Sequence, residues 1–357
     1  MRNVRSEHAS TSGRGAARAS VSPRGWLGIG LATLLALAAP ALLAACGGGD
    51  ALTVYSGRSE SLIGPIFERF EQDTGIQLAV RYAGTGELTA TLLEEGANSP
   101  ADLFVAQDPA SLVQIADLLD PLPDDLTAGV PPWAVDGQRR WVGISARQRV
   151  VAYNSDAVNP ANLPATAMGY TAAEWGGGRL GWAPTNGSFQ AMVAVMIEVW
   201  GESATRTWLE GIRANQPMAY SGNTALVAAI RNGEVDAGFT NHYYALRLAS
   251  ESGGDFAARN HHLDPGDPGG ALLLSGAGVL ASSDSKAAAQ RLAQYLLGAD
   301  AQTHLATQVF EIPLNPSVAP PSSTPRAADL ARSPINFSDL RRLERVQELL
   351  RETGILQ

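Results

Sequence analysis

Residues 52–84, "LTVYSGRSESLIGPIFERFEQDTGIQLAVRYAG", hold two short runs of β-branched and aromatic residues with a helical pattern between them. In that pattern, apolar residues recur at helical spacing from Leu62 to Phe70, and Gly75 supplies a helix stop. The stretch therefore predicts a strand, a helix and a second strand. A β-α-β unit of this kind is typical of a mostly parallel sheet.

The same alternation continues along the chain. Residues 85–100 predict a helix and residues 101–107 a strand with a buried middle. A second set follows, with a strand, turn and long apolar helix over 178–201, a helix over 225–233, and a strand, loop and helix over 235–253. We therefore expect an α/β fold of two lobes, each a mostly parallel sheet flanked by helices, with the ligand cleft between them.

Two segments can connect the lobes. Residues 131–154 could carry the chain from the first lobe to the second, and residues 264–280 could carry it back. A surface connection rich in Pro, Ser and Ala over 316–333 precedes a last amphipathic helix over 337–354. The predicted organisation is a signal peptide at 1–45, a tether at 46–50, the first lobe at 51–147, the second lobe at 148–271, a return segment of the first lobe at 272–320, and a C-terminal helical segment at 321–357.

The N-terminal leader predicts export and attachment to a membrane. Five arginines precede an apolar segment, "WLGIGLATLLALAAPALLAAC", which ends in small residues as secretion signals do. Its last residues, "LAAC", resemble a bacterial lipobox, which implies that Cys46 is lipidated and becomes the mature N-terminus. The alternative is a plain signal peptide or a membrane anchor with a chance cysteine.

The charge and the cysteine content exclude some classes of function. Residues 1–45 hold five Arg and one Glu, so 21 basic and 34 acidic residues remain after them, a formal net charge of −13. Nucleic acid is therefore not an expected partner. Cys46 is the only cysteine, which excludes intramolecular disulfides and zinc sites built on several thiolates.

Motifs of catalysis are not found in the sequence. It contains no G-x-S-x-G nucleophile elbow, no G-x-x-x-x-G-K-[ST] phosphate loop, and no G-x-G-x-x-G after a predicted strand. A non-enzymatic, ligand-binding role is the expectation. In open parallel sheets, ligands bind beyond the carboxyl ends of strands, and four predicted strand ends could converge on one cleft: residues 56–60, 107–110, 185–188 and 241–244.

The segment "PTNGSF" has the chemistry of an anion site. Backbone N–H groups from Thr185 to Ser188 would be unpaired at the start of a helix, where negative charge is favoured. An ordinary helix cap is the alternative. Arg147 and Arg149 would face one side of a strand, so one of them could clamp the same anion, or both could be solvated surface.

Tyr243 and Tyr244 in "TNHYYALRL" could share a target only where the backbone turns from strand to helix, which is where the pattern places them. A phenol with a pKa near ~10 becomes a good ligand only for a strongly acidic cation, and its hard oxygen suits ferric iron. Packing is the alternative for an arbitrary pair of tyrosines.

Six blocks, in order, carry a family resemblance: "LTVYSGRSESLIGPIFERFEQDTGI", "SPADLFVAQDPASL", "WVGISARQRVVAYN", "RLGWAPTNGSF", "GNTALVAAIRNGEVDAGFTNHYYALRL" and "DPGGALLLSGAGVL". From about residue 51 to 313, the chain resembles the ferric-ion-binding periplasmic proteins of bacterial ABC iron importers. The resemblance implies a type II periplasmic-binding-protein fold, whose lobes close on the ligand without catalysis. It also implies delivery to a membrane permease and its ATPase subunit, and we expect a monomer.

The resemblance assigns residues of the second lobe. Tyr243 and Tyr244 match the paired phenolate ligands of ferric iron. A second group matches the loop that holds a synergistic anion, carbonate or phosphate, and its supporting residues: Thr185, Asn186, Gly187, Ser188, Asn223, Asn241 and Arg147.

The first lobe departs from the family pattern. Ser59, flanked by Arg58, stands where many members supply a His, and Gln107 stands where they supply a Glu. Phe189 also replaces a ligating Tyr of some relatives. Iron could be completed by Glu60, Asp108, bound anions or water, or could arrive as a chelate.

Our first interpretation is a lipid-anchored, extracytoplasmic protein that captures ferric iron. The alternatives are the same fold binding a phosphonate-like or other small anion without metal, and an extracytoplasmic hydrolase.

Overall fold

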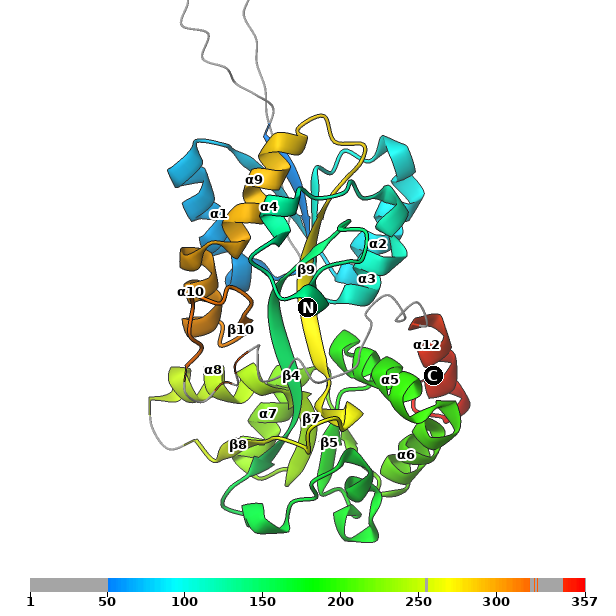
Figure 1. The fold of residues 1–357 in the computed structure, drawn as a ribbon. Coiled ribbons are helices and arrows are strands. Elements are labelled where there is room, and N and C mark those ends of the chain that lie inside the picture. Colours follow the sequence, from blue (N-terminus) through cyan, green and yellow to red (C-terminus); the bar gives the residue numbers. More distant parts are fainter. Residues whose placement is uncertain (1–50, 254–255, 322–323, 325, 327–342, 357) are drawn as a thin grey trace, which may run out of the picture. The chain divides into compact units, whose positions relative to one another are not determined.

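The computed structural model describes residues 51–253, 256–321, 324, 326 and 343–356 (Figure 1). The predicted signal peptide, Cys46 and the tether lie outside the described residues, as does most of the Pro-rich connection. No helix among the described residues is long and apolar enough to cross a membrane.

The predicted β-α-β-α-β pattern at the start is confirmed. We call the part built on these strands the first lobe. Helix α1 ends at Gly75, whose left-handed backbone (φ 74°) lets its N–H donate to the carbonyl of Glu71. The elements of this lobe up to the crossing strand are β1 (Leu52–Ser56), α1 (Glu60–Thr74), β2 (Leu78–Tyr82), α2 (Thr85–Glu95), β3 (Leu103–Ala106), α3 (Pro109–Gln114) and α4 (Asp124–Thr127).

The second lobe is built on strands β5, β6 and β7. Strands β5 and β7 lie in the segments 178–201 and 235–253, where the sequence predicts them. Its helix α6 was not predicted from the sequence. The elements are β5 (Leu180–Trp182), α5 (Gly187–Trp200), α6 (Glu202–Ala214), β6 (Met218–Ala219), α7 (Asn223–Asn232), β7 (Ala237–Asn241), α8 (His242–Ser252) and β8 (Ala258–His261).

Strands β4 (Val142–Asn154) and β9 (Leu272–Val279) lie in the middle of the strand order, between the strands of the two lobes. In Figure 1 they run side by side between the lobes. Strand β4 pairs with β9 from Val142 to Gln148 and with β7 from Arg149 onward. The crossing strands therefore place residues of both lobes beside one continuous sheet.

Ten strands of the described residues form this sheet, in the order β2-β1-β3-β9-β4-β7-β5-β6, with β8 and β10 also paired to β4. The pairs among β1, β2 and β3 and among β5, β6 and β7 are parallel, whereas every pair with β4 or β9 is antiparallel. The expected α/β fold, with a mainly parallel sheet in each lobe, is confirmed. The remaining elements are α9 (Lys286–Leu297), α10 (Ala299–Thr307), β10 (Ile312–Pro313) and α12 (Leu343–Glu352).

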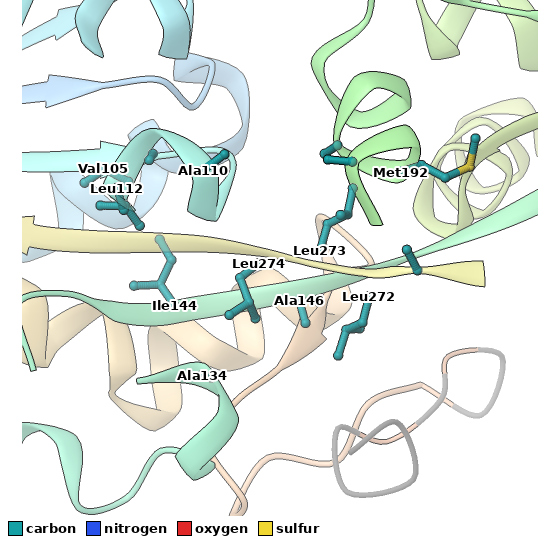
Figure 2. Close-up of a cluster of buried hydrophobic side chains, with 14 of the residues drawn as sticks. Val105, Ala110, Leu112, Ala134, Ile144, Ala146, Met192, Leu272, Leu273 and Leu274 are labelled. Atoms are coloured by element: carbon teal, nitrogen blue, oxygen red, sulfur yellow. The ribbon is translucent and has the colours of Figure 1, made fainter. Parts of the chain in front are cut away.

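The two faces of β4 differ in chemistry. Ile144 and Ala146 point into the hydrophobic core, and Figure 2 places them beside Leu272 to Leu274 of β9. The alternate residues Ser145, Arg147 and Arg149 are polar, and all three are also buried. Because successive side chains of a strand point to opposite faces, β4 separates an apolar core from a buried polar face.

The C-terminal helix α12 contacts α5 of the second lobe and buries Val346, Leu349 and Leu350. Arg345 on its outer side pairs with Glu202 at the start of α6. This end of the chain therefore supports the helix whose N-terminus carries the predicted anion loop.

Candidate functional site

The tyrosine pair lies at the predicted strand-to-helix turn. Strand β7 ends at Asn241 and α8 begins at His242. The rings of Tyr243 and Tyr244 stack, with centroids 4.3 Å apart and planes at 28°. Tyr243 is buried and Tyr244 half-buried, and the hydroxyl of Tyr243 has no hydrogen-bond partner among the described residues. The turn brings both aromatic rings to one place and leaves a buried phenol unpaired.

The surroundings keep the unliganded Tyr243 protonated. Burial raises the pKa of Tyr243 well above the usual phenol value, and Tyr244 and Glu311 raise it further, although Arg147 and Arg58 oppose them. Such a phenol becomes a phenolate ligand only for a cation acidic enough to displace its proton.

His242 fixes the start of α8. Its Nδ1 accepts a hydrogen bond from the backbone N–H of Gln148 at 3.2 Å, and its carbonyl accepts one from Asn260 Nδ2 at 2.7 Å. Burial lowers the pKa of His242 to about 4, so the ring is neutral at pH 7. Sequence reasoning did not single out His242, because its partners lie on β4 and β8.

Arg58, Arg147 and Arg149 are buried, with at most 1% of each exposed. Arg58 follows β1, and the other two lie on the polar face of β4. Against the opposing effect of burial, both tyrosines raise the pKa of Arg58 and of Arg149, and Tyr243 raises the pKa of Arg147. Buried guanidinium groups are costly unless they are paired, so their partners define what each arginine does.

Arg58 is paired within the protein. Its guanidinium donates to both carboxylate oxygens of Glu311, at 2.7 and 3.0 Å, and to Ser275 Oγ at 2.8 Å. Ser145 Oγ donates to the same carboxylate at 2.6 Å. Burial opposes the charge of Arg58, but Glu311 raises its pKa above the usual arginine value. Glu311 and Ser275 were missed from the sequence, since they lie more than 200 residues from Arg58 along the chain.

Arg147 is held toward the first lobe. It donates to Ser275 Oγ at 2.9 Å and to the backbone carbonyl of Gln107. Only its Nε lacks a partner among the described residues. The sequence-based role of Arg147 at the anion is a prediction that these contacts do not test.

Arg149 is held toward the second lobe. It donates to Asn241 Oδ1 at 3.0 Å, and neither Nε nor Nη2 has a partner among the described residues. These two nitrogens form one edge of the guanidinium, which is the arrangement that binds a carboxylate or a phosphate through two hydrogen bonds. Burial lowers the pKa of Arg149 to about 9, which leaves it charged at pH 7.

The predicted anion loop is a helix cap connected to Arg149. Asn186 caps α5, because its Oδ1 accepts from Ser188 N at 3.0 Å, and Asn223 Nδ2 donates to the same oxygen at 3.2 Å. Asn241 Nδ2 donates to Ser188 Oγ at 3.2 Å. Arg149, Asn241, Ser188, Asn186 and Asn223 thus form one connected set. Thr185 and Gly187, in the same turn, are exposed.

The first-lobe candidates are not part of this hydrogen-bonded set. Ser59 and Glu60 are exposed at the start of α1, and Asp108 caps α3 by accepting from Ser111 N and Oγ at 2.9 and 3.1 Å. The hydrogen bonds of Asp108 go to Ser111, and the Tyr243 hydroxyl has no partner among the described residues, so no such bond joins Asp108 to Tyr243. Likewise, the part of the chain that the structure describes contains no group of three or more His, Cys, Asp or Glu placed to hold a metal.

Phe189 belongs to the core of the second lobe. It is fully buried, and its ring packs on Trp182 and Trp208 with centroid distances of 5.9 and 6.2 Å. The residue that replaces a ligating Tyr of some relatives therefore contributes packing here.

Comparison with known proteins assigns the class. The chain matches the family of bacterial extracellular solute-binding proteins over residues 66–332, and it belongs to that family. The protein is therefore an extracytoplasmic one. The expected two-lobed, type II periplasmic-binding-protein fold is confirmed by the similar solved structures described next.

Individual relatives are more specific. The major ferric iron-binding protein of Neisseria meningitidis is 31% identical over 328 residues, covering 90% of this chain and 98% of the relative. The crystal structure of iron-bound HitA from Pseudomonas aeruginosa has a TM-score of 0.80 at 33% identity, covering 85% and 99%. A Trichodesmium protein (IdiA, FutA) in complex with iron and citrate ligands has a TM-score of 0.73 at 25% identity, covering 86% and 100%.

Proposed function

We propose that this protein is the substrate-binding component of an ABC iron importer, which captures ferric iron together with a synergistic anion and delivers it to a membrane permease. One observation carries the proposal: two stacked phenols lie at the end of β7, one of them buried and unpaired, within the electrostatic influence of three buried arginines. The iron-binding names of the similar proteins support the same ligand.

In this proposal Tyr243 and Tyr244 ligate ferric iron as phenolates. Ferric iron is a strong Lewis acid that suits hard oxygen ligands, so its binding to the two phenolate oxygens would release their protons to solvent. The neighbouring arginines would stabilise the resulting negative charge. The remaining ligands would be oxygens of the anion, water, or the first-lobe carboxylates Glu60 and Asp108. Iron is cargo here, and no step of catalysis is required.

The anion, carbonate or phosphate, would bind at the N-terminus of α5. The backbone N–H groups of Thr185 and Gly187 would donate to it, as would Arg149, because the N–H groups of Asn186 and Ser188 already have partners within the turn. Asn223 and Asn241 would support the turn. Arg147, the arginine expected from the sequence, has both terminal nitrogens bonded within the protein and would contribute its charge. The connected hydrogen bonds from Asn186 to Asn241 support this placement, because they hold the turn in shape before any ligand arrives.

Closure of the lobes, whose predicted bounds are 51–147 with 272–320 and 148–271, would exclude water and strengthen these charge interactions. Reopening, or reduction of the iron, would weaken them and permit release to the permease and its ATPase. Attachment through lipidated Cys46, followed by the short tether 46–50, would keep a monomer close to that permease. Several acyl chains are needed for stable anchoring.

The test is metal analysis of protein purified without chelator, combined with the visible spectrum. We expect one ferric ion per chain and a phenolate-to-iron charge-transfer band. A protein that binds phosphate or a phosphonate tightly, yet neither retains iron nor develops colour with a ferric salt, would instead support the anion-binding alternative.

A further inference from the structure

Glu311 is a fully buried carboxylate that belongs to none of the predicted ligand sets. It lies between α10 and β10, directly after Phe310, whose positive φ of 62° is unusual for a residue with a side chain. The turn places Glu311 next to strand β4, because the following residue, Ile312 of β10, pairs with Ala146 of β4. A turn with a strained residue next to a buried charge indicates that Glu311 has a role other than reversing the direction of the chain.

The contacts of Glu311 join the first lobe to the crossing strands. Its carboxylate accepts from Arg58, which follows β1, and from Ser145 of β4. Ser275 of β9 accepts from both Arg58 and Arg147, at 2.8 and 2.9 Å. The Arg58 guanidinium is therefore fixed by Glu311 and Ser275, and only its Nε has no partner among the described residues.

The charge balance of this cluster is uneven. Within it, three buried arginines (Arg58, Arg147 and Arg149) stand against one buried carboxylate, that of Glu311. The other buried carboxylate among the described residues, Asp136, is paired with Arg140 instead. Loading iron with two phenolates adds three positive charges and removes two protons, a net gain of one positive charge. If a dianion binds as well, the net change is one negative charge. An additional positive charge nearby therefore disfavours iron alone and favours iron with its anion.

We propose that Glu311 is a positioning residue that sets how strongly iron capture depends on the accompanying anion, by fixing Arg58 and cancelling one of the buried positive charges. The inference rests on the proposed function and deepens it. It places control of the anion requirement in a residue that touches neither the iron nor the anion.

The experiment compares apparent iron affinities, measured by chelator competition at the charge-transfer band. Each protein is assayed in buffer free of carbonate and phosphate, and again with saturating phosphate. The ratio of the two affinities is the anion dependence. For Glu311→Gln, which keeps the shape but removes the charge, we expect this ratio to rise about tenfold or more. Glu311→Asp, which keeps the charge, should remain near the parent.

Two further variants separate charge from structure. The double variant Arg58→Gln with Glu311→Gln removes one charge of each sign, so its ratio should return toward that of the parent although the ion pair is lost. Gln302→Leu is the structural control, because buried Gln302 anchors the same segment through Leu314 N and Asn315 N without carrying charge. It should lower the thermal midpoint and leave the ratio unchanged.

The outcomes are distinct. A folded Glu311→Gln variant with the ratio of the parent, or a Gln302→Leu variant with an equal rise, would overturn the role of Glu311. If Glu311→Gln does not fold, a double variant that folds but keeps an altered ratio would overturn it as well. A parent protein that binds no ferric iron in either buffer would overturn the proposed function itself.

Discussion

The two sides of the site use their buried polar groups in opposite ways. On the first-lobe side, both terminal nitrogens of Arg58 donate to Glu311 or Ser275. The terminal nitrogens of Arg147 donate to Ser275 and Gln107. On the second-lobe side, the Tyr243 hydroxyl and one whole edge of Arg149 have no partner among the described residues.

This difference indicates where ligand binding occurs. A buried polar group without a partner costs free energy, so a group of them around one spot is stabilised when a ligand satisfies them. On the first-lobe side, the terminal nitrogens of Arg58 and Arg147 are already bonded, and only the Nε atom of each has no partner among the described residues. These two guanidinium groups therefore supply fixed positive charge rather than ligand-binding groups. The second-lobe groups gain most from a ligand, and the predictions below test this division.

The largest effect should follow the loss of a phenol oxygen. Tyr243→Phe and Tyr244→Phe should each lower ferric iron affinity about a thousandfold or more, beyond the 10–100-fold typical of an outer-shell partner, and remove the charge-transfer colour. Tyr243→Phe should leave stability nearly unchanged, because its hydroxyl has no partner among the described residues to lose. Absorbance titration and thermal unfolding measure the two effects.

Tyr170→Phe is the matched control, since Tyr170 is also buried with an unpaired hydroxyl but packs against Trp175 and Phe239 in the second-lobe core. It should bind iron as the parent does. An undiminished charge-transfer band in both Tyr243→Phe and Tyr244→Phe would mean that the tyrosine pair contributes only packing.

The next effect concerns the first-lobe ion pair and should appear in stability. Arg58→Met leaves the Glu311 carboxylate buried without its main partner, so the free energy of unfolding of the apo protein should fall by about 3 kcal/mol. Chemical denaturation at neutral pH measures this loss. An unchanged unfolding midpoint would mean that the pair is not desolvated as the structure indicates.

The same pair predicts a pH dependence. Burial alone would raise the pKa of Glu311, but Arg58 and Arg147 bring it below the usual value of 4.5. A depressed carboxyl pKa contributes stability that is complete above the unfolded value and is lost as pH falls through the folded one. The parent should therefore lose stability below about pH 4.5 more steeply than the double variant Arg58→Gln with Glu311→Gln. Parallel curves would contradict this.

A smaller effect should distinguish the two arginines of β4. Arg149→Gln should weaken anion-dependent iron binding about tenfold, because it removes the two-nitrogen edge that has no partner among the described residues. Arg147→Gln should weaken it less, since the terminal nitrogens of Arg147 are bound within the protein. Titration of phosphate into the iron-loading assay measures both variants, and the reverse ranking would place the anion beside Arg147.

The smallest effect should come from the surface of α12. Arg345 pairs with Glu202 and Glu352 at the solvent-exposed side of this helix, and exposed ion pairs contribute little and are screened by salt. Arg345→Ala should lower the thermal midpoint slightly at low salt and leave iron affinity unchanged. A large loss of iron binding would mean that α12 controls the anion turn at the start of α5.

Local patterns in the sequence were enough for much of the fold and for the second-lobe site. Hydrophobic spacing and Gly75 predicted α1, and the alternation of strand and helix predicted the two parallel sets of strands. The turn that carries Tyr243 and Tyr244 was predicted because a strand ends and a helix begins within a few residues. These signals are local, since they depend on neighbours along the chain.

The first-lobe network was decided only by the tertiary structure. In "FEIPLN", Glu311 looks like any polar residue before a short strand, and nothing in the sequence pairs it with Arg58, 253 positions away. The sequence alone also could not distinguish the role of Arg147 from that of Arg149, because the two residues share one face of a strand. Strand β4 changes partners from β9 to β7 between them, so one arginine meets the first lobe and the other meets Asn241. The side chains and their spacing were set by the sequence, but their partners depended on where the chain returned to cross the sheet.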